Sequence, residues 1–238
     1  MGYHELSAPS TRVWLRRVAR DLGWFDPSVD GRPWAAAERA LARHPVLKPA
    51  VRAVGPCTLR PRRDYFRVLT LSLFNQQLAT KTAATLHRRF TSLFPGRRPT
   101  PERVREALSG GVPVETLKSC GLSRQKRAYL LDLAEHFIDG RIPTRRLRRM
   151  DDAEIVACLT KVRGVGVWTA EMFLLFALNR PDVWPVGDLG LQEAARRAYG
   201  LPDRPAPRAL ADLGEDLAPW RSVATWYLWR GLSAGVWK

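Results

Sequence analysis

Apolar residues return at every third or fourth position along much of this chain, and this spacing constrains its fold more than any other feature. In the segment Asp64–Phe74 the residues at that spacing are Phe66, Leu69 and Leu73. The next segment repeats the pattern with Ala83, Leu86, Phe90 and Leu93. Such a period predicts amphipathic α-helices. Strict alternation of apolar and polar residues over strand length is missing, so we expect an all-α fold.

Residues that commonly start helices mark where several segments begin. Thr100 precedes Pro101, which combines an N-cap with proline in the first turn. Ser123 stands ahead of another apolar-periodic segment, and Asp151 with Glu154 has the spacing of a capping box. Further helices are expected around Arg12–Leu22, Pro33–Arg43 and Trp168–Leu178, and from Pro219 onward.

The chain carries a strong positive charge. Its 238 residues include 39 Lys and Arg against 23 Asp and Glu, which gives a net charge of +16 at pH 7. Such an excess favours a polyanionic partner, because phosphate binding releases condensed counterions. Composition alone leaves open a merely solvated basic surface. The hydrophobic share of 45% allows a substantial buried core, so extensive disorder is not expected.

The cysteine and histidine residues form no local metal-binding motif. Cys57, Cys120 and Cys158 are far apart, and no CxxC pair occurs. We therefore expect neither a structural zinc nor an iron–sulfur cluster. No secretory segment is evident and no apolar run has membrane-spanning length, so we expect no membrane partner. These features predict a soluble protein of a reducing compartment, the cytoplasm.

Two glycines bracket one valine in Gly164-Val165-Gly166, between two helical segments. Glycine tolerates positive φ and lets another chain approach closely, so the second helix begins with exposed backbone N–H groups. These groups, helped by the helix dipole, can bind a phosphate. A Gly-x-Gly alone is weak evidence, because most such pairs are ordinary turns. Its place between two helices of a very basic chain strengthens the interpretation.

Asp188 stands twenty residues after Trp168, in the segment Trp184–Leu191. Local evidence favours an N-cap, because an aspartate ahead of an apolar helix commonly has that role. The capping role is compatible with a functional one, since a cap holds the carboxylate in one place beside a loop.

Four ordered segments resemble a known family. Leu159–Asp188 is similar to the core of the helix-hairpin-helix (HhH-GPD) DNA glycosylases, in which a Gly-[Val/Ile]-Gly hairpin precedes a catalytic aspartate at about this distance. Three further segments resemble the alkylation-repair branch of that superfamily, the 3-methyladenine DNA glycosylase II family. They are Ser72–Lys81, Gly121–Lys126 and Trp220–Arg230. The similarity runs from about Val46 to Leu232.

The resemblance implies two helical subdomains with an interdomain cleft. Residues 1–75 and 186–238 would form one subdomain, and residues 76–185 the other, a bundle that contains the helix-hairpin-helix motif at 159–170. The larger members of this branch begin with a β-rich domain. The short helical start of this chain predicts that such a domain is absent.

The resemblance also implies base flipping, in which a damaged nucleotide leaves the duplex and enters a pocket. Asp188 matches the family's catalytic carboxylate, which stabilises positive charge on the sugar as the N-glycosidic bond breaks. Alkylated purines are cationic and attract an electron-rich indole. The expected pocket residues are Trp168, Met172, Trp229, Trp226 and Tyr227, although core packing is the commoner role of a tryptophan.

Trp168 indicates a monofunctional enzyme. In bifunctional relatives that resemble endonuclease III, a lysine at this place forms a Schiff base with the sugar, and cluster cysteines follow. This chain has neither the lysine nor the cysteines. We therefore expect base excision without strand cleavage, and no cofactor for catalysis.

The expected partner is double-stranded DNA that contains alkylated bases, bound by a monomer. The residues expected at the DNA are Gly164, Val165, Gly166, Lys161, Arg163, Thr169, Arg124, Lys126, Gln76 and Gln77. Gln77 would fill the gap left by the flipped base, where many relatives have leucine. In relatives, backbone carbonyls at the places of Thr160, Val162 and Val165 hold a structural monovalent cation.

Three alternatives remain open at this point. A non-catalytic helix-hairpin-helix DNA-binding protein would explain the charge and the hairpin, but not Asp188 with the pocket aromatics. A basic RNA-binding protein would explain the charge alone. A glycosylase with another lesion preference, such as uracil or hypoxanthine, would share all of these motifs.

Overall fold

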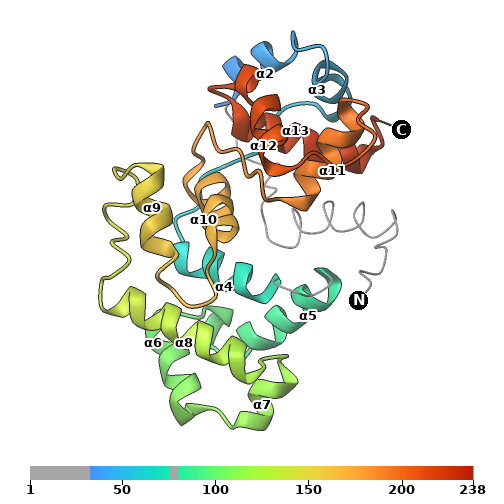
Figure 1. The fold of residues 1–238 in the computed structure, drawn as a ribbon. Helices are drawn as coiled ribbons and strands as arrows, with labels where there is room; N and C mark the ends of the chain where they lie inside the picture. Colours follow the sequence, from blue (N-terminus) through green and yellow to red (C-terminus); the bar gives the residue numbers. More distant parts are fainter. Residues whose placement is uncertain (1–32, 76–79, 238) are drawn as a thin grey trace. The chain divides into compact units, whose positions relative to one another are not determined.

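The computed structural model describes residues 33–75 and 80–237, and every regular element in these ranges is a helix or a helical turn (Figure 1). The predicted all-α class is confirmed for this part of the chain. None of its helices is long and apolar enough to cross a membrane. The helix expected around Arg12–Leu22 lies outside the described residues. The chain divides into two compact units: unit 1 comprises Met1–Arg60 and Asn179–Lys238, and unit 2 comprises Pro61–Leu178.

Unit 1 is organised around its last helix. Its elements are α2 (Ala35–Leu41), α3 (Lys48–Val54), α11 (Leu189–Ala198), α12 (Pro207–Leu213), the short turn η4 (Glu215–Leu217) and α13 (Arg221–Ala234). Helix α13 packs against α2, α3 and α11, and it is buried along most of its length. A helix covered on all sides belongs to a core. Tyr227, at its centre, has no exposed surface and donates its hydroxyl to the Gly55 carbonyl at 2.9 Å.

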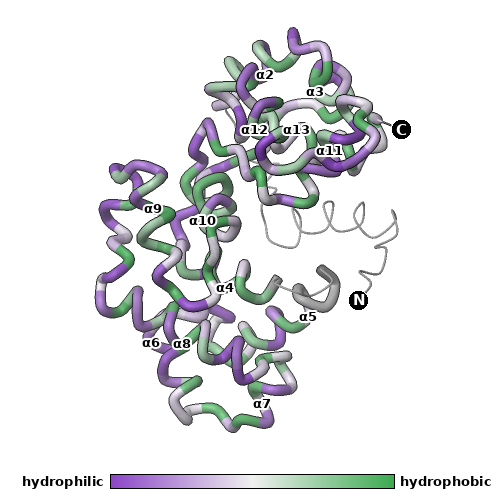
Figure 2. Tube along the Cα trace, viewed as in Figure 1, coloured by the Kyte–Doolittle hydropathy of each residue, from purple (hydrophilic) through white to green (hydrophobic). Residues whose placement is uncertain are grey.

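Unit 2 is a bundle in which α4, α8 and α10 supply much of the core. Its helices are α4 (Tyr65–Asn75), α5 (Thr80–Thr91), α6 (Pro101–Glu106), α7 (Val114–Ser119), α8 (Arg124–Ile138), α9 (Asp152–Leu159) and α10 (Val167–Phe173). The turns are η1 (Pro95–Arg97), η2 (Ala107–Gly111) and η3 (Leu174–Leu178). Helix α8 packs against α4 and α6, and α10 packs against α4 and α9. Hydrophobic residues predominate along α10 and η3 (Figure 2), and most residues from Thr169 to Ala177 are buried.

The unit boundaries differ from the expected ones. The division falls at Arg60/Pro61 and Leu178/Asn179, rather than after residues 75 and 185. Helix α4 therefore belongs to unit 2, because it packs against α5, α8 and α10. Its Phe66 meets Phe137 of α8 edge to face, with ring centroids 5.2 Å apart. Residues 179–185 belong to unit 1 because they bind the start of α13.

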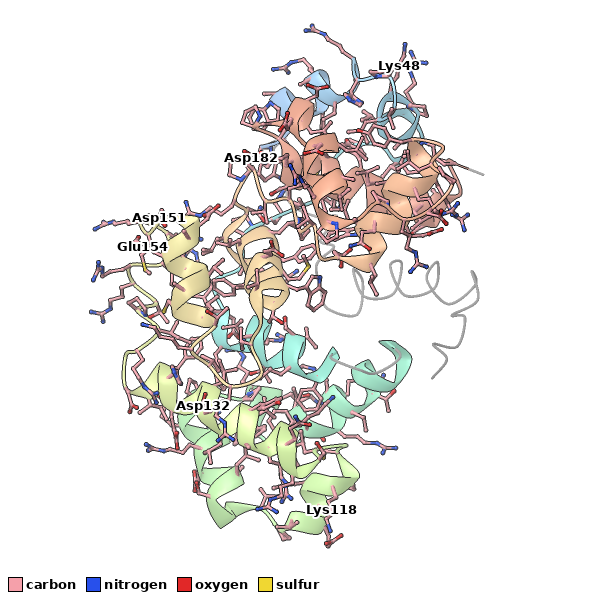
Figure 3. All side chains as sticks on the ribbon, viewed as in Figure 1. Lys48, Lys118, Asp132, Asp151, Glu154 and Asp182 are labelled. Atoms are coloured by element: carbon pink, nitrogen blue, oxygen red, sulfur yellow. The ribbon has the colours of Figure 1, made fainter. Side chains whose placement is uncertain are left out.

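The predicted helix starts are confirmed at three places. The Thr100 hydroxyl accepts from the Arg103 N–H at 3.4 Å, and the Ser123 hydroxyl accepts from the Lys126 N–H at 3.2 Å. The capping box of α9 is complete: the Asp151 carboxylate accepts from the backbone of Glu154, which returns the contact to the Asp151 N–H (Figure 3). Helices α3, α7 and α12 were not predicted; each has six or seven residues, too few for a clear apolar period.

Candidate functional site

Asp188 is a buried carboxylate at the start of α11. It is 5% exposed, and its Oδ1 accepts from the Leu191 backbone N–H at 2.6 Å. This is the N-cap predicted from the sequence, and the capping contact satisfies one of the backbone donors that every helix start leaves unpaired. Gln192, one residue further, donates its side-chain amide to the Val186 carbonyl at 2.9 Å and so ties the preceding loop to the same helix.

A second donor reaches the same oxygen of Asp188. The indole Nε1–H of Trp229, on α13, donates to Oδ1 at 3.0 Å. Gly190 leaves room for this contact, because a Cβ there would lie 3.1 Å from Oδ1 and 3.4 Å from the indole nitrogen. Two N–H groups from two helices thus bind the same carboxylate oxygen. The sequence placed Trp229 near Asp188, but as an aromatic surface rather than as a hydrogen-bond donor.

The loop that leads to Asp188 is anchored at the start of α13. Asp182 (Figure 3) forms a two-pronged ion pair with the Arg221 guanidinium, with distances of 2.7 and 2.6 Å, and this pair lowers the pKa of Asp182. The Ser222 hydroxyl donates to the Arg180 carbonyl at 2.6 Å and accepts from the Val183 N–H at 2.9 Å. Sequence analysis missed this anchor, because the paired residues are about forty positions apart and form no motif.

The predicted hairpin of unit 2 is present between α9 and α10. The Val162 N–H donates to the Leu159 carbonyl at 3.1 Å, and the Val165 N–H donates to the Val162 carbonyl at 3.0 Å. Both valine side chains are buried, whereas Lys161 and Arg163 are exposed. The turn therefore alternates apolar anchors with exposed basic residues. A positively charged, solvent-facing loop is what a phosphate-binding hairpin requires.

Different local constraints act on the two glycine positions of the hairpin, Gly164 and Gly166. Gly164 has φ +82°, and a Cβ there would lie 2.3 Å from the Tyr129 ring, so both backbone conformation and space demand glycine. Gly166 has an ordinary φ of −92°, and a Cβ there would meet no protein atom within 4 Å. No contact within the described protein explains Gly166. The open space beside it would let a partner approach the backbone closely.

The predicted DNA-contacting side chains differ in what they contact. Arg124, Lys161 and Arg163 are exposed, and none has a carboxylate within ion-pair distance in the described ranges. Lys126 instead donates its ammonium to the Phe74 carbonyl at 3.0 Å, and burial lowers its pKa. Lys126 thus binds the last turn of α4. Thr169 is buried in α10, and Gln76 and Gln77 lie outside the described residues.

The five aromatic and thioether residues expected at a base pocket are divided between the units. Trp168 is half-buried and Met172 is buried, both on α10 of unit 2. Trp226 of unit 1 meets the Tyr227 ring edge to face at 4.9 Å, and Tyr227 lies in the core as described above. The structure thus assigns Tyr227 to packing. Trp229 donates to Asp188, as described above.

Of the hairpin carbonyls expected to bind a cation, that of Val162 has a hydrogen-bond donor. The Val162 carbonyl accepts from Val165, as described, and the Thr160 hydroxyl donates to the Val156 carbonyl at 2.8 Å. In the described part of the chain, no group of three or more His, Cys, Asp or Glu side chains is placed to hold a metal ion.

Comparison with known proteins gives consistent matches. A family model described as HhH-GPD superfamily base excision DNA repair protein matches residues 71–219. DNA-3-methyladenine glycosylase 1 of Schizosaccharomyces pombe is 36% identical over 171 residues, which cover 71% of this chain and 73% of that protein.

Solved structures agree with these sequence matches. The S. pombe 3-methyladenine DNA glycosylase in complex with abasic DNA superposes with a TM-score of 0.75 and 33% identity, over 86% of this chain and 100% of that one. A DNA-3-methyladenine glycosidase of Bacillus halodurans superposes with a TM-score of 0.72 and 31% identity, over 87% and 92%.

The Trp229–Asp188 contact generates a prediction. In Trp229→Phe the carboxylate loses a buried donor, a contact to a charged group whose loss corresponds to about a tenfold to hundredfold lower rate. We expect base release from alkylated duplex DNA to slow by this factor under single-turnover conditions. Trp34→Phe is the matched control, since it removes an indole hydrogen bond to the Leu59 carbonyl in the same unit. Equal rates in both variants would contradict a role for Trp229 in positioning Asp188.

Proposed function

The chain belongs to the HhH-GPD superfamily of base excision DNA repair proteins, and from this premise we propose that it is a monofunctional DNA glycosylase that releases alkylated purines. The observation that carries the proposal is the geometry of Asp188, a buried carboxylate with two N–H donors on one oxygen. A capping role alone requires the Leu191 contact but not the Trp229 contact. We further propose that the protein acts on duplex DNA as a monomer in the cytoplasm.

The chemistry asked of Asp188 is electrostatic. As the N-glycosidic bond breaks, positive charge develops on the sugar, and a fixed negative charge beside it lowers the energy of the transition state more than that of the substrate. The two N–H donors orient the carboxylate before the reaction, so no reorganisation is needed when the charge develops. The same carboxylate can also orient or deprotonate the attacking water.

Selection for alkylated purines would come from charge and aromatic surfaces. A purine alkylated at N3 or N7 is cationic, which strengthens its attraction to an indole and weakens its glycosidic bond. A modest catalyst then suffices. Trp168 and Met172 on α10, and Trp226 on α13, remain the predicted contacts to the base. Trp229 would act through Asp188.

The DNA backbone would be bound at the hairpin. Lys161 and Arg163 are exposed and form no ion pair with a carboxylate in the described part of the chain, and the space beside Gly166 admits close approach to the backbone. Phosphate contacts of this kind position a protein on the duplex without reading its sequence. Arg124, at the exposed start of α8, is a further predicted phosphate contact. Gly164 would contribute by shaping the turn.

We also propose a monovalent cation at the carbonyls of Thr160, Val162 and Val165. Carbonyl oxygens suit a hard cation, and the Val162 carbonyl, although it accepts from Val165, has a second lone pair. Replacing K⁺ by a bulky tetraalkylammonium ion at equal ionic strength should weaken binding of an abasic-site duplex several-fold. Unchanged affinity in both salts would contradict the cation site.

Asp188→Asn separates an enzyme from a binding protein. The amide oxygen can still accept from Leu191 and Trp229, so the cap and the fold should persist while the charge is lost. We expect excision to fall by about 10²–10³-fold, with affinity for an abasic-site duplex within twofold of the wild type. Undiminished excision would remove Asp188 from its proposed role, and a wild type that binds DNA without excising any base would favour the non-catalytic alternative.

The assay for Asp188 should use a panel of single-lesion duplexes. The protein should release 3-methyladenine and 7-methylguanine from these duplexes. If the pocket selects the positive charge of the base, it should release hypoxanthine and uracil far more slowly. Preference for uracil or hypoxanthine would keep the glycosylase assignment and overturn the alkylated-purine substrate.

Trp168 predicts the absence of strand cleavage. Because tryptophan cannot form a Schiff base with the sugar, alkylated duplex DNA should yield intact abasic strands that break only after alkali treatment. Borohydride should trap no covalent protein–DNA adduct. Prompt nicking without alkali, or a covalent adduct trapped by borohydride, would contradict the monofunctional assignment.

A further inference from the structure

Helix α8 contacts the hairpin through two residues one turn apart, Asp132 and Tyr129. Asp132 (Figure 3) accepts the backbone N–H of Arg163 on its Oδ2, at 2.7 Å. Tyr129, three residues earlier and so on the same helical face, places its ring against Gly164. Two neighbouring hairpin residues are thus held by a carboxylate and an aromatic ring. The Tyr129 hydroxyl itself accepts from Gln125 at 2.6 Å, which fixes the ring.

Buried His136, one turn further along α8, lies beside Asp132. The Nδ1 of buried His136 lies 2.8 Å from the Asp132 carbonyl and 3.5 Å from its Oδ2. Arg141 contacts the other ring nitrogen, Nε2, at 3.1 Å. A guanidinium can only donate, so Nε2 accepts and the ring proton resides on Nδ1, facing Asp132. His136 thereby donates to the backbone carbonyl of Asp132 and lies beside its carboxylate.

A carboxylate here is unfavourable for DNA binding in electrostatic terms. Asp132 contacts the backbone of a hairpin whose exposed side chains are Lys161 and Arg163. Beside an incoming phosphate, its charge is repulsive. Because its oxygen bonds a main-chain N–H, what it contributes is geometric. The bond satisfies a backbone donor at the turn and holds the position of the Val162–Arg163 peptide.

We propose that Asp132 is a positioning residue for DNA binding, which holds the hairpin backbone in its phosphate-binding conformation through the Arg163 N–H. This inference rests on the proposed function of the hairpin. For a variant that lacks the Asp132 carboxylate, the inference and the charge alone predict changes in DNA affinity of opposite sign. Removing a negative charge from a chain of net charge +16 should tighten DNA binding, whereas removing the acceptor for Arg163 should weaken it.

The test measures affinity for undamaged and abasic-site duplexes. Asp132→Ala should weaken binding of both by about ten- to hundredfold, the effect of one lost hydrogen bond to a charged group. Asp132→Asn keeps an acceptor oxygen and loses the charge, and should bind as tightly as the wild type or tighter. Glu135→Ala is the matched control, since it removes one carboxylate from the same helix, and it too should bind as the wild type or tighter.

Two further measurements separate positioning from general destabilisation. Excision at saturating enzyme should stay within twofold in Asp132→Ala, because Asp188 belongs to unit 1. Amide hydrogen exchange should accelerate at residues 161–166 in Asp132→Ala and return to the wild-type rate in Asp132→Asn. Should Asp132→Ala fail to fold, Asp132→Ser takes its place in both measurements, because its shorter side chain keeps a polar group but cannot reach the Arg163 N–H, and it is expected to weaken binding as Asp132→Ala would.

The inference is overturned if Asp132→Ala binds DNA as tightly as the wild type, or if Asp132→Asn is as weak as Asp132→Ala. A double variant, Lys161→Ala with Arg163→Ala, identifies which proposal has failed. If this variant loses affinity and Asp132→Ala does not, the positioning role alone falls. If the double variant also binds normally, the hairpin is not the DNA interface, and the proposed DNA-binding site falls with the inference.

Discussion

Oδ1 of Asp188 accepts two hydrogen bonds, from the backbone of α11 and from the Trp229 indole of α13. A buried carboxylate is unfavourable unless it is hydrogen-bonded, so these contacts are a condition for having a charge there at all. The same two bonds determine which way the charge faces. Gly190 favours the contact, since a Cβ there would press on both the oxygen and the indole. Stability and orientation thus depend on one oxygen atom.

Helix α13 can serve as a fixed reference for this oxygen because it is the buried centre of unit 1. It contacts the Asp188 loop at both ends: Ser222 binds the loop near its start, and Trp229, seven residues or about two turns later, binds Asp188. The spacing places both contacts on one face of the helix. The Tyr227 hydroxyl bond to Gly55 secures the helix from another side. The loop is irregular, yet rigid elements set its geometry.

The sequence predicted features that depend on local periodicity or short spacing. The helical class, the caps at Thr100 and Ser123, the Asp188 cap and the hairpin all follow from residues close together in the chain. What it could not predict depends on pairs far apart. Trp229 was placed beside Asp188 by resemblance. Its role as a hydrogen-bond donor depends on the side-chain rotamer of Trp229, which the sequence does not specify. The contact of Lys126 with a carbonyl 52 positions away is another such pair, which does not bear on its predicted role at a phosphate.

The acidic residues of this basic chain explain which of its cations are available to a partner. Glu193 accepts from three arginines of α11 and the loop after it, which lower its pKa to about 2, and Asp182 pairs with Arg221. Those guanidinium groups form ion pairs within the protein. Among the described residues, Lys161 and Arg163 form no such ion pair, and the nearby Asp132 accepts from the hairpin backbone. Placing the carboxylate on an N–H leaves the positive charge of the hairpin free to face a phosphate.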